Sequence, residues 1–453
     1  MEKNLTTGSV FKNVVLFSLP YLLSYFLQTL YGMADLFIIG QFEGVASTTA
    51  VSIGSQVMHM LTVMIVGLSM GTTVSVGQAV GAGDRKQAAH NIGNTVILFL
   101  VVSIALTAIL LSLVHPIVVA MSTPTDAVSG TVTYLTICFI GIPFITSYNI
   151  ISSIFRGLGD SKSPMCFIAT ACAANIALDY LFMGVLHLGP AGAALGTTLS
   201  QAISVVVSLT VILKRRSIVL KKSDFKPCRA VMGKILGVGI PIAFQDGLIQ
   251  VAFIIIITII ANQRGLNDAA AVGIVEKVIS FLFLVPSSML STVSALGAQN
   301  IGAGKPERAI QTLRYAVMLA AGFGVLASIA IQFTAEGIVS LFTDPSTADG
   351  AAVVRFGGQY LRGYIFDCIF AGIHFSFSGF FCACRKSGLS FLHNILAIVL
   401  MRVPGVYVTS KLFPATLLPM GLATAAGSLL SVVICLIAFG VIRRKSTLVL
   451  VEE

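Results

Sequence analysis

The chain has 453 residues, of which 56% are hydrophobic and only 10% are charged, and its formal net charge is +10. A soluble domain carries about 25% charged residues, so this composition excludes an ordinary water-exposed surface and indicates a protein whose partner is the lipid bilayer. The excess of Lys and Arg does not indicate nucleic-acid binding, because these residues cluster in short loops between apolar runs, as in membrane proteins.

The apolar runs, taken in chain order, predict twelve membrane-spanning helices. A helix needs about 20 predominantly apolar residues to cross a bilayer, and the first run is also too long for a cleavable signal peptide. The predicted spans cover residues 13–38, 50–76, 91–114, 132–155, 164–186, 190–213, 235–261, 271–297, 312–333, 358–382, 388–411 and 418–442.

The basic residues predict how these spans are oriented. Most of the 28 Lys and Arg residues lie in every second connection, counted from the N-terminus, and the densest group lies between Lys214 and Lys234. The opposite connections hold little beyond Arg264, Arg355, Arg362 and Lys411. Because cytoplasmic loops are enriched in Lys and Arg, we expect both termini in the cytoplasm. We also expect a bacterial inner (plasma) membrane location and a monomer.

The two halves of the chain repeat one another. Pro20 aligns with Pro241, and the same shift places QAVGAG at 78–83 over QNIGAG at 299–304. Each half holds six predicted spans, an even number, so both halves enter the membrane from the same side as parallel repeats. We predict an all-α fold of two pseudo-symmetric six-helix bundles, at 1–213 and 235–453, joined by a basic cytoplasmic linker at 214–234.

Four polar residues of the first half are candidates for a proton or cation site. An ionisable side chain inside a span is costly and therefore indicates function. Asp35 and Asp179 both lie toward the outer leaflet, counted at about 1.5 Å of rise per residue. Asn175 shares a helix face with Asp179, and Thr197 lies at the same end. Two carboxylates at one depth could hold a proton near neutral pH. The structural alternative is that Asp35 is an exposed helix end and that Asn175 bonds a neighbouring helix.

Other ionisable residues lie within the predicted spans of both halves. Lys277 either lines a cavity or extends toward the lipid headgroups, and the adjacent Glu276 faces a different direction. Arg402 is expected to pair with an acid of the second half. His59 and His374 are expected to be buried and hydrogen-bonded.

Catalytic and nucleotide-binding motifs are not predicted. RGLGDSK at 156–162 lacks the Gly-Lys-Ser/Thr order of a phosphate-binding loop and follows a membrane helix. No nucleophile–His–acid set or metal-spaced cluster is evident. We therefore expect neither an enzyme nor a bound cofactor or metal, apart from a coupling ion, H⁺ or Na⁺, whose gradient supplies the energy.

Five motifs resemble those of the multidrug and toxic compound extrusion (MATE) transporters, and the resemblance covers essentially the whole chain. They are LYGMADLFIIG at 30–40, SYNIISSIFRGLGDSKSPM at 147–165, NIALD at 175–179, AGAALGTTLSQ at 191–201 and QNIGAGKPERA at 299–309. The pattern is similar to the bacterial branch with a cation site in the N-terminal bundle.

The resemblance implies a V-shaped pair of bundles around a central cavity, which exchanges drug-like small molecules for protons or sodium. The residues of this chain that match the cation site of that branch are Asp35, Asn175, Asp179 and Thr197. The resemblance implies that they bind H⁺ or Na⁺. Pro20 matches the proline at which the first helix bends, and a proline inside a helix removes a backbone hydrogen bond.

The second half departs from the branch with an ion site in its C-terminal bundle. Ile249 and Gln250 stand where that branch has a Glu, and Asp367 lies about one turn from the expected acid. Asp246 has no assigned partner, so Asp246, Asp367 and Lys277 are expected only as cavity-lining candidates.

A flippase of lipid-linked precursors, from the same superfamily, is the alternative function. It would need several basic residues in its cavity to bind a pyrophosphate. The predicted spans offer only Lys277 and Arg402, with Arg362 near an end, which favours an exporter of cationic or neutral amphiphiles.

Overall fold

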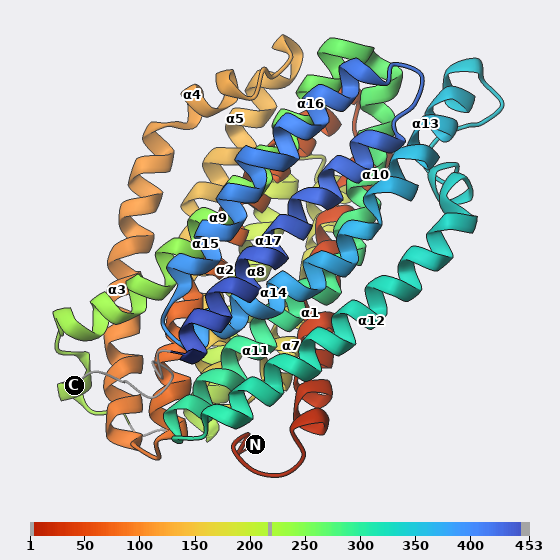
Figure 1. The fold of residues 1–453 in the computed structure, drawn as a ribbon. Helices are drawn as coiled ribbons and strands as arrows, with labels where there is room; N and C mark the ends of the chain where they lie inside the picture. Colours follow the sequence, from red (N-terminus) through yellow and green to blue (C-terminus); the bar gives the residue numbers. More distant parts are fainter. Residues whose placement is uncertain (1–3, 216–219, 445–453) are drawn as a thin grey trace. The chain divides into compact units, whose positions relative to one another are not determined.

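The structure is a computed structural model that describes residues 4–215 and 220–444, and within these ranges it is helical with no strand (Figure 1). In these ranges, eleven helices are long and apolar enough to cross a membrane. The bent pair α5 (Thr125–Ile140) and α6 (Ile142–Gly157), with 47° between its helices, brings the number of spans to as many as twelve. The predicted all-α, multi-pass membrane fold is confirmed.

Each repeat is a series of long helices with one short π-helical segment. The first repeat contains α1 (Val10–Phe42), α2 (Val45–Gly81), α3 (Arg85–Ser112), α4 (Val114–Ala120), α5, α6, α7 (Lys162–Asp179), the π-helical η1 (Tyr180–Val185) and α8 (Gly189–Arg215). The second contains α9 (Arg229–Arg264), α10 (Leu266–Leu282), α11 (Leu284–Gly302), α12 (Pro306–Val339), α13 (Ala348–Tyr364), α14 (Phe366–Ala383), α15 (Ser387–Ala397), the π-helical η3 (Ile398–Arg402), α16 (Val403–Leu412) and α17 (Leu418–Arg444). A short 3-10 turn, η2 (Lys222–Phe225), lies between them.

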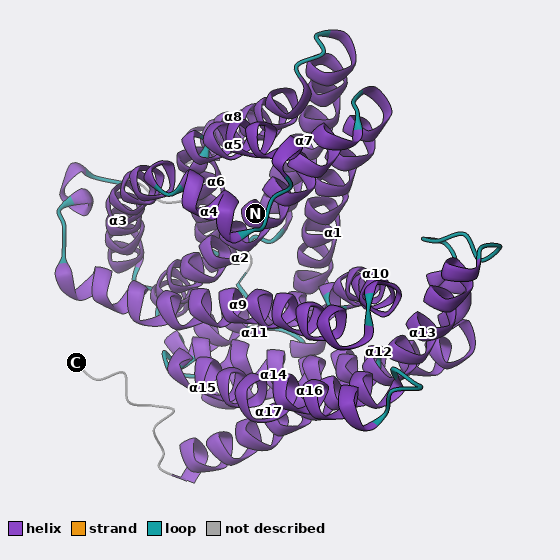
Figure 2. Cartoon of the chain, turned by 90° about the horizontal axis from the view of Figure 1, so that it is seen from above, coloured by secondary structure: helices purple, strands orange, loops and turns teal. Residues whose placement is uncertain are grey.

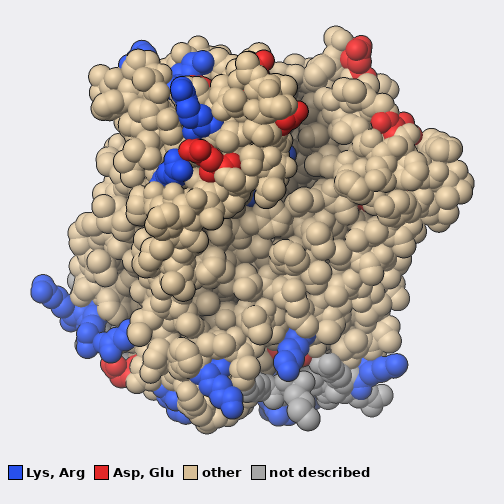
Figure 3. Space-filling model, turned by 90° about the vertical axis from the view of Figure 1, so that its right-hand side faces the viewer, with Lys and Arg blue, Asp and Glu red and all other residues tan. Residues whose placement is uncertain are grey.

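The surface suits a lipid environment. Large apolar side chains are exposed along the long helices, among them Leu100 and Ile104 on α3 and Leu326 and Phe333 on α12. On the face drawn in Figure 3, charged side chains lie toward the two ends and the broad surface between them is uncharged. Helices suit this solvent because all their backbone hydrogen bonds are made within the segment.

The sequence repeat produces the same local turn twice. Gly83 and Gly304 follow α2 and α11 with φ angles of 73° and 68°, a conformation that glycine adopts without strain. Each glycine N–H bonds the carbonyl three residues earlier, on Val80 and Ile301, at 3.0 Å. The QAVGAG and QNIGAG motifs therefore end their helices in the same way.

The repeats differ where one of them contains a proline. The predicted span 271–297 is two helices, because α10 ends at Leu282 and α11 begins at Leu284. Pro286 would clash with the carbonyl of Leu282, four residues earlier, in a continuous helix. The equivalent residue of the first repeat is Ile65, and α2 runs through it unbroken.

Contacts divide the chain into two compact units. The first unit contains Leu19–Gly239 and the second contains Leu5–Ser18 together with the described residues from Ile240 onward. In the first, α2 packs against α3, α5 and α6. In the second, α17 lies beside α14 and α16 (Figure 2). The boundaries at Ser18 and Gly239 are equivalent positions of the repeat, two residues before Pro20 and Pro241. The repeat boundaries at 213 and 235 stay a prediction.

The N-terminal segment is held within the second unit by the start of α12. Lys305 Nζ donates a hydrogen bond to the Thr6 carbonyl oxygen at 3.0 Å, and Arg308 Nη2 donates to that of Gly8 at 3.1 Å.

The segment before α9 is held in the same way within the first unit, by the start of α3. Asn94 Nδ2 donates to the Asp224 carbonyl oxygen at 3.4 Å, and Asn94 Oδ1 accepts from the Cys228 N–H at 2.6 Å. Gly93 permits this approach, because a Cβ there would collide with the backbone of Asp224. The two repeats thus exchange equivalent segments.

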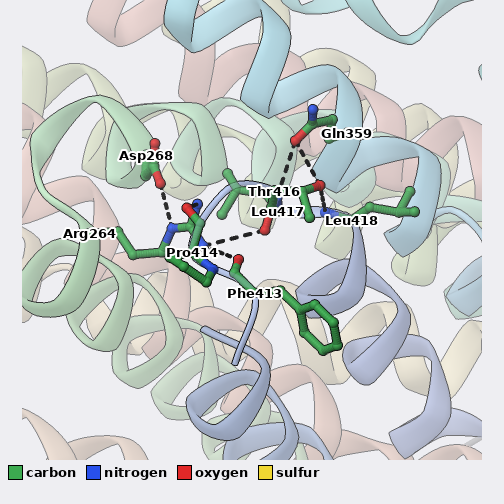
Figure 4. Close-up of polar contacts among 8 residues, drawn as sticks. All are labelled: Arg264, Asp268, Gln359, Phe413, Pro414, Thr416, Leu417 and Leu418. Atoms are coloured by element: carbon green, nitrogen blue, oxygen red, sulfur yellow. Dashed lines mark hydrogen bonds and ion pairs between the residues drawn. The ribbon is translucent and has the colours of Figure 1, made fainter. Parts of the chain in front are cut away.

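Arg264, at the end of α9, fastens a loop of the second unit (Figure 4). Its Nε is ion-paired with Asp268 Oδ2 at 2.5 Å, and its Nη atoms donate to the carbonyl oxygens of Phe413 at 2.9 Å and Pro414 at 2.8 Å. The Arg264 side chain is only 5% exposed. Its planar fork therefore joins α9, α10 and the α16–α17 connection.

Arg264→Lys is expected to lower the free energy of unfolding by about 1–3 kcal/mol, because an ammonium group cannot reproduce the fork of hydrogen bonds to two carbonyls and a carboxylate. Thermal unfolding in detergent measures the effect. Arg355→Lys, at an exposed position of α13, is the matched control. Equal midpoints for the two variants would refute the role of Arg264.

Candidate functional site

Asp35 lies buried in α1 and is bonded to α8. Only 2% of the residue is exposed, and its Oδ2 accepts a hydrogen bond from Thr197 Oγ1 at 3.1 Å. The alternative that Asp35 is an exposed helix end is therefore wrong. A buried carboxylate within a span is costly and is most often functional.

Asn175 and Asp179 lie beside this carboxyl group, on the last turn of α7. Both side chains interact with Asp35, and the two residues are 1% and 0% exposed. Among the described residues, Asp35 Oδ1, both Asp179 oxygens and both Asn175 amide atoms lack a partner in hydrogen-bond geometry. Buried polar atoms are nearly always bonded, so these atoms fit a small ligand. Carboxylate, amide and hydroxyl oxygens suit a proton or a hard cation such as Na⁺.

Local features of α7 and α8 bring these groups together. Gly196 on α8 leaves the space that the Asp179 carboxyl occupies, because a Cβ at Gly196 would overlap Asp179 Oδ1. The helix also changes to the π-helical η1 directly after Asp179, and π-helical turns are frequent at functional sites. Small residues in α8 thus let two membrane helices approach closely.

Gly196→Ala is expected to weaken binding of a proton or Na⁺ at these carboxyl groups about tenfold, because overpacking costs about 1–3 kcal/mol and must displace the Asp179 carboxyl. The measurement is the ion concentration at which binding to the purified protein is half-maximal. Gly40→Ala on α1, where an added Cβ meets nothing within 4 Å, is the control. An unchanged half-maximal concentration would exclude this role for Gly196.

A pocket of about 80 Å³ opens next to Asp35 within the first unit. Its lining includes Thr197, Gln28, Tyr31, Ser55, Met58, His59, Thr62, Tyr134, Tyr148, Asn149 and Gln201. Pockets for drug-sized ligands measure about 300–1,000 Å³, so this one suits water and small ions. Most of these residues were not predicted from the sequence, although the spacing of Ser55, His59 and Thr62 places them on one face of α2.

The histidine predictions had different outcomes. His59 is exposed and lines this pocket, so the expectation of a buried histidine is wrong there. His374 is buried in the second unit as expected, where it stacks on Phe375 at 4.9 Å between ring centroids, but its Nδ1 has no hydrogen-bond partner among the described residues.

The remaining predicted residues lie in the second unit, apart from Pro20, which lies inside α1. Lys277 is exposed, and Asp246 is half-buried with Gln245 Nε2 at 3.5 Å from its Oδ1. Asp367 is 0% exposed and bonded by Arg402 at 2.8 Å. The expected pairing of Arg402 is confirmed, and the expectation that Asp367 lines a cavity is wrong, because its carboxyl is enclosed with its counter-ion.

Comparison with known proteins matches this arrangement to one family. The sequence model of the MatE family matches twice, over residues 20–181 and 241–408, so the two matches begin at Pro20 and Pro241. The chain is 30% identical to "Probable multidrug resistance protein YpnP" of Bacillus subtilis, over 93% of this chain and 92% of that one. It is 25% identical to an "FAD transporter" of Shewanella oneidensis, over 85% of each chain.

The fold has close counterparts among solved structures. A MOP superfamily transporter from Pyrococcus furiosus superimposes with a TM-score of 0.91 over 98% of each chain, at 21% identity. A structure described as an outward-facing multidrug resistance MATE family transporter of the MOP superfamily superimposes with a TM-score of 0.90, also at 21% identity.

Proposed function

Because this chain belongs to the MatE family, whose sequence model matches both of its halves, we propose that it is a secondary active exporter. It carries cationic or amphiphilic drug-like compounds out of the cell in exchange for protons or sodium ions. The proposed ion coupling is supported by one observation, the buried cluster of Asp35, Asn175, Asp179 and Thr197 within the spans of the first unit. The protein resides in the plasma membrane as a monomer, with both termini in the cytoplasm.

The coupling ion acts on the position of α1. Two carboxylates buried side by side repel one another and lack the solvation of water. A proton or Na⁺ between Asp35 and Asp179 offsets this repulsion and draws α1 toward α7 and α8. Pro20 removes one backbone hydrogen bond of α1, which makes this the point at which the helix bends. Ion binding therefore favours one conformation of α1, and loss of the ion releases it.

The small pocket delivers the ion and not the drug. Its polar lining reaches Asp35, and about 80 Å³ admits water and ions only. The drug-like substrate is bound elsewhere or in another conformation of the transporter.

The flippase alternative lacks a supporting observation. Arg402 is neutralised by Asp367, which leaves Lys277 as the one unpaired basic residue among those predicted within the described spans. A pyrophosphate would need several such cations.

The test is efflux of a fluorescent cationic dye from proteoliposomes that contain the purified chain, under an imposed proton gradient or an imposed sodium gradient. Efflux driven by one gradient supports the exporter and identifies the ion, with protein-free liposomes as the control for leakage. No efflux under either gradient, combined with movement of a lipid-linked pyrophosphate between leaflets, would replace the proposal with the flippase function.

A further inference from the structure

Another buried carboxyl group lies in the second unit, outside the site described above. Glu276, on α10, is 8% exposed. The hydroxyl groups of Tyr360 and Tyr364, on α13, donate to its Oε1 and Oε2, each at 3.4 Å. Both tyrosines are fully buried, so this carboxyl group has two hydrogen-bond donors in a largely buried environment.

Among the described residues, Glu276 forms no ion pair, whereas Asp367 and Arg402 pair with one another. Arg402 Nη2 donates to Asp367 Oδ2 at 2.8 Å and to Ser428 Oγ at 3.0 Å. Both members of this pair act electrostatically on Glu276. The titratable and charged groups that face Glu276 are therefore Tyr360 and Tyr364 on α13, Asp367 on α14 and Arg402 on η3. One guanidinium therefore acts on two carboxylates, and Asp367 is the one to which it is hydrogen-bonded.

We propose that Glu276 binds one proton, as a second proton-binding site of this protein, separate from Asp35 and Asp179. A bound proton makes the cluster electrically neutral: Asp367 and Arg402 compensate one another and Glu276 carries no charge. A buried, uncompensated carboxylate within the membrane is otherwise strongly disfavoured.

The surroundings of Glu276 favour a proton over a metal ion. A hard cation needs about six oxygen ligands with free lone pairs, whereas the two hydroxyl groups here donate to the carboxylate and a guanidinium lies nearby.

Glu276 and its partner Tyr364 both lie close to breaks between consecutive helices. Glu276 lies less than two turns before the break between α10 and α11, and Tyr364 is the last residue of α13 before the break to α14. Protonation weakens the acceptor strength of the carboxyl group toward both tyrosines. Protonation therefore weakens the hydrogen bonds that join α10 to α13, next to both breaks.

Infrared absorption of the purified full-length protein tests the site without any transport. The background is Asp35→Asn/Asp179→Asn, which removes the carboxyl groups of the first site. The expected result is a carboxylic acid C=O band at neutral pH that disappears when Glu276→Gln is added. Glu307→Gln, at an exposed position of α12, leaves the band unchanged. Identical spectra with and without Glu276→Gln at every pH would overturn the proposal, as would loss of the band on addition of Na⁺.

If Glu276→Gln fails to fold, the infrared band of Tyr364→Phe tests the site instead. The ionised form of Glu276 then loses one hydrogen-bond donor, so the midpoint at which the band disappears moves to higher pH, and an unmoved midpoint contradicts the site. The infrared result does not depend on the exporter function. Dye efflux without the band refutes only Glu276, and the band without dye efflux refutes only the exporter.

Discussion

Asp35→Asn and Asp179→Asn are each expected to reduce ion-driven efflux about hundredfold, because truncating a buried charge interaction costs about 2–5 kcal/mol. Asn matches the shape of Asp, so the packing of α1, α7 and α8 is kept while the negative charge and the titratable proton are lost. The measurement is initial dye efflux from proteoliposomes under the gradient that drives the wild-type protein.

Asp126→Asn is the matched control, because this aspartate is exposed in the first turn of α5. Its efflux should equal that of the wild-type protein. Full transport in both site variants would refute coupling at the first unit.

Arg402→Met is expected to lower the free energy of unfolding by about 3–5 kcal/mol, because it leaves Asp367 buried without its counter-ion. The Asp367 carboxyl is 0% exposed and Arg402 is its partner at 2.8 Å. Adding Asp367→Leu to this variant should recover most of the loss, since an apolar pair of similar volume needs no compensation.

Thermal unfolding can be followed with a thiol-reactive dye, because the chain has no Trp and eight Cys. Five of the free cysteines, Cys138, Cys172, Cys368, Cys382 and Cys435, are buried and react only on unfolding. A single variant that unfolds at the wild-type temperature would show that the pair does not stabilise the second unit.

That the candidate cation-site residues lie together could be predicted from the sequence because the evidence for it is local. Asp35, Asn175 and Asp179 are polar residues inside apolar spans, and helical spacing sets the depth and face of each. The role of Gly196 could not be predicted in this way. It depends on how closely α7 and α8 approach, which no spacing within α8 reveals.

Two features of the second unit were not predicted correctly from the sequence. Asp367 was expected at a cavity because an acid within a span usually faces water or a partner, and only the packed structure shows that Arg402 encloses it. The break between α10 and α11 was missed although Pro286 signalled it, because the apolar run continues unchanged across the proline. Hydropathy reports burial in lipid and does not report backbone continuity.

The segments that the two repeats exchange also bear on how such a protein could arise. An ancestor with one repeat would have had one N-terminal segment, equivalent both to Leu5–Ser18 and to the residues that end at Gly239. It would have had no second repeat on which this segment could pack. That segment would have packed on another copy of the same chain, as in a domain-swapped dimer. Gene duplication and fusion would then have turned an intermolecular exchange into an intramolecular one, in which Asn94 holds one exchanged segment and Lys305 holds the other.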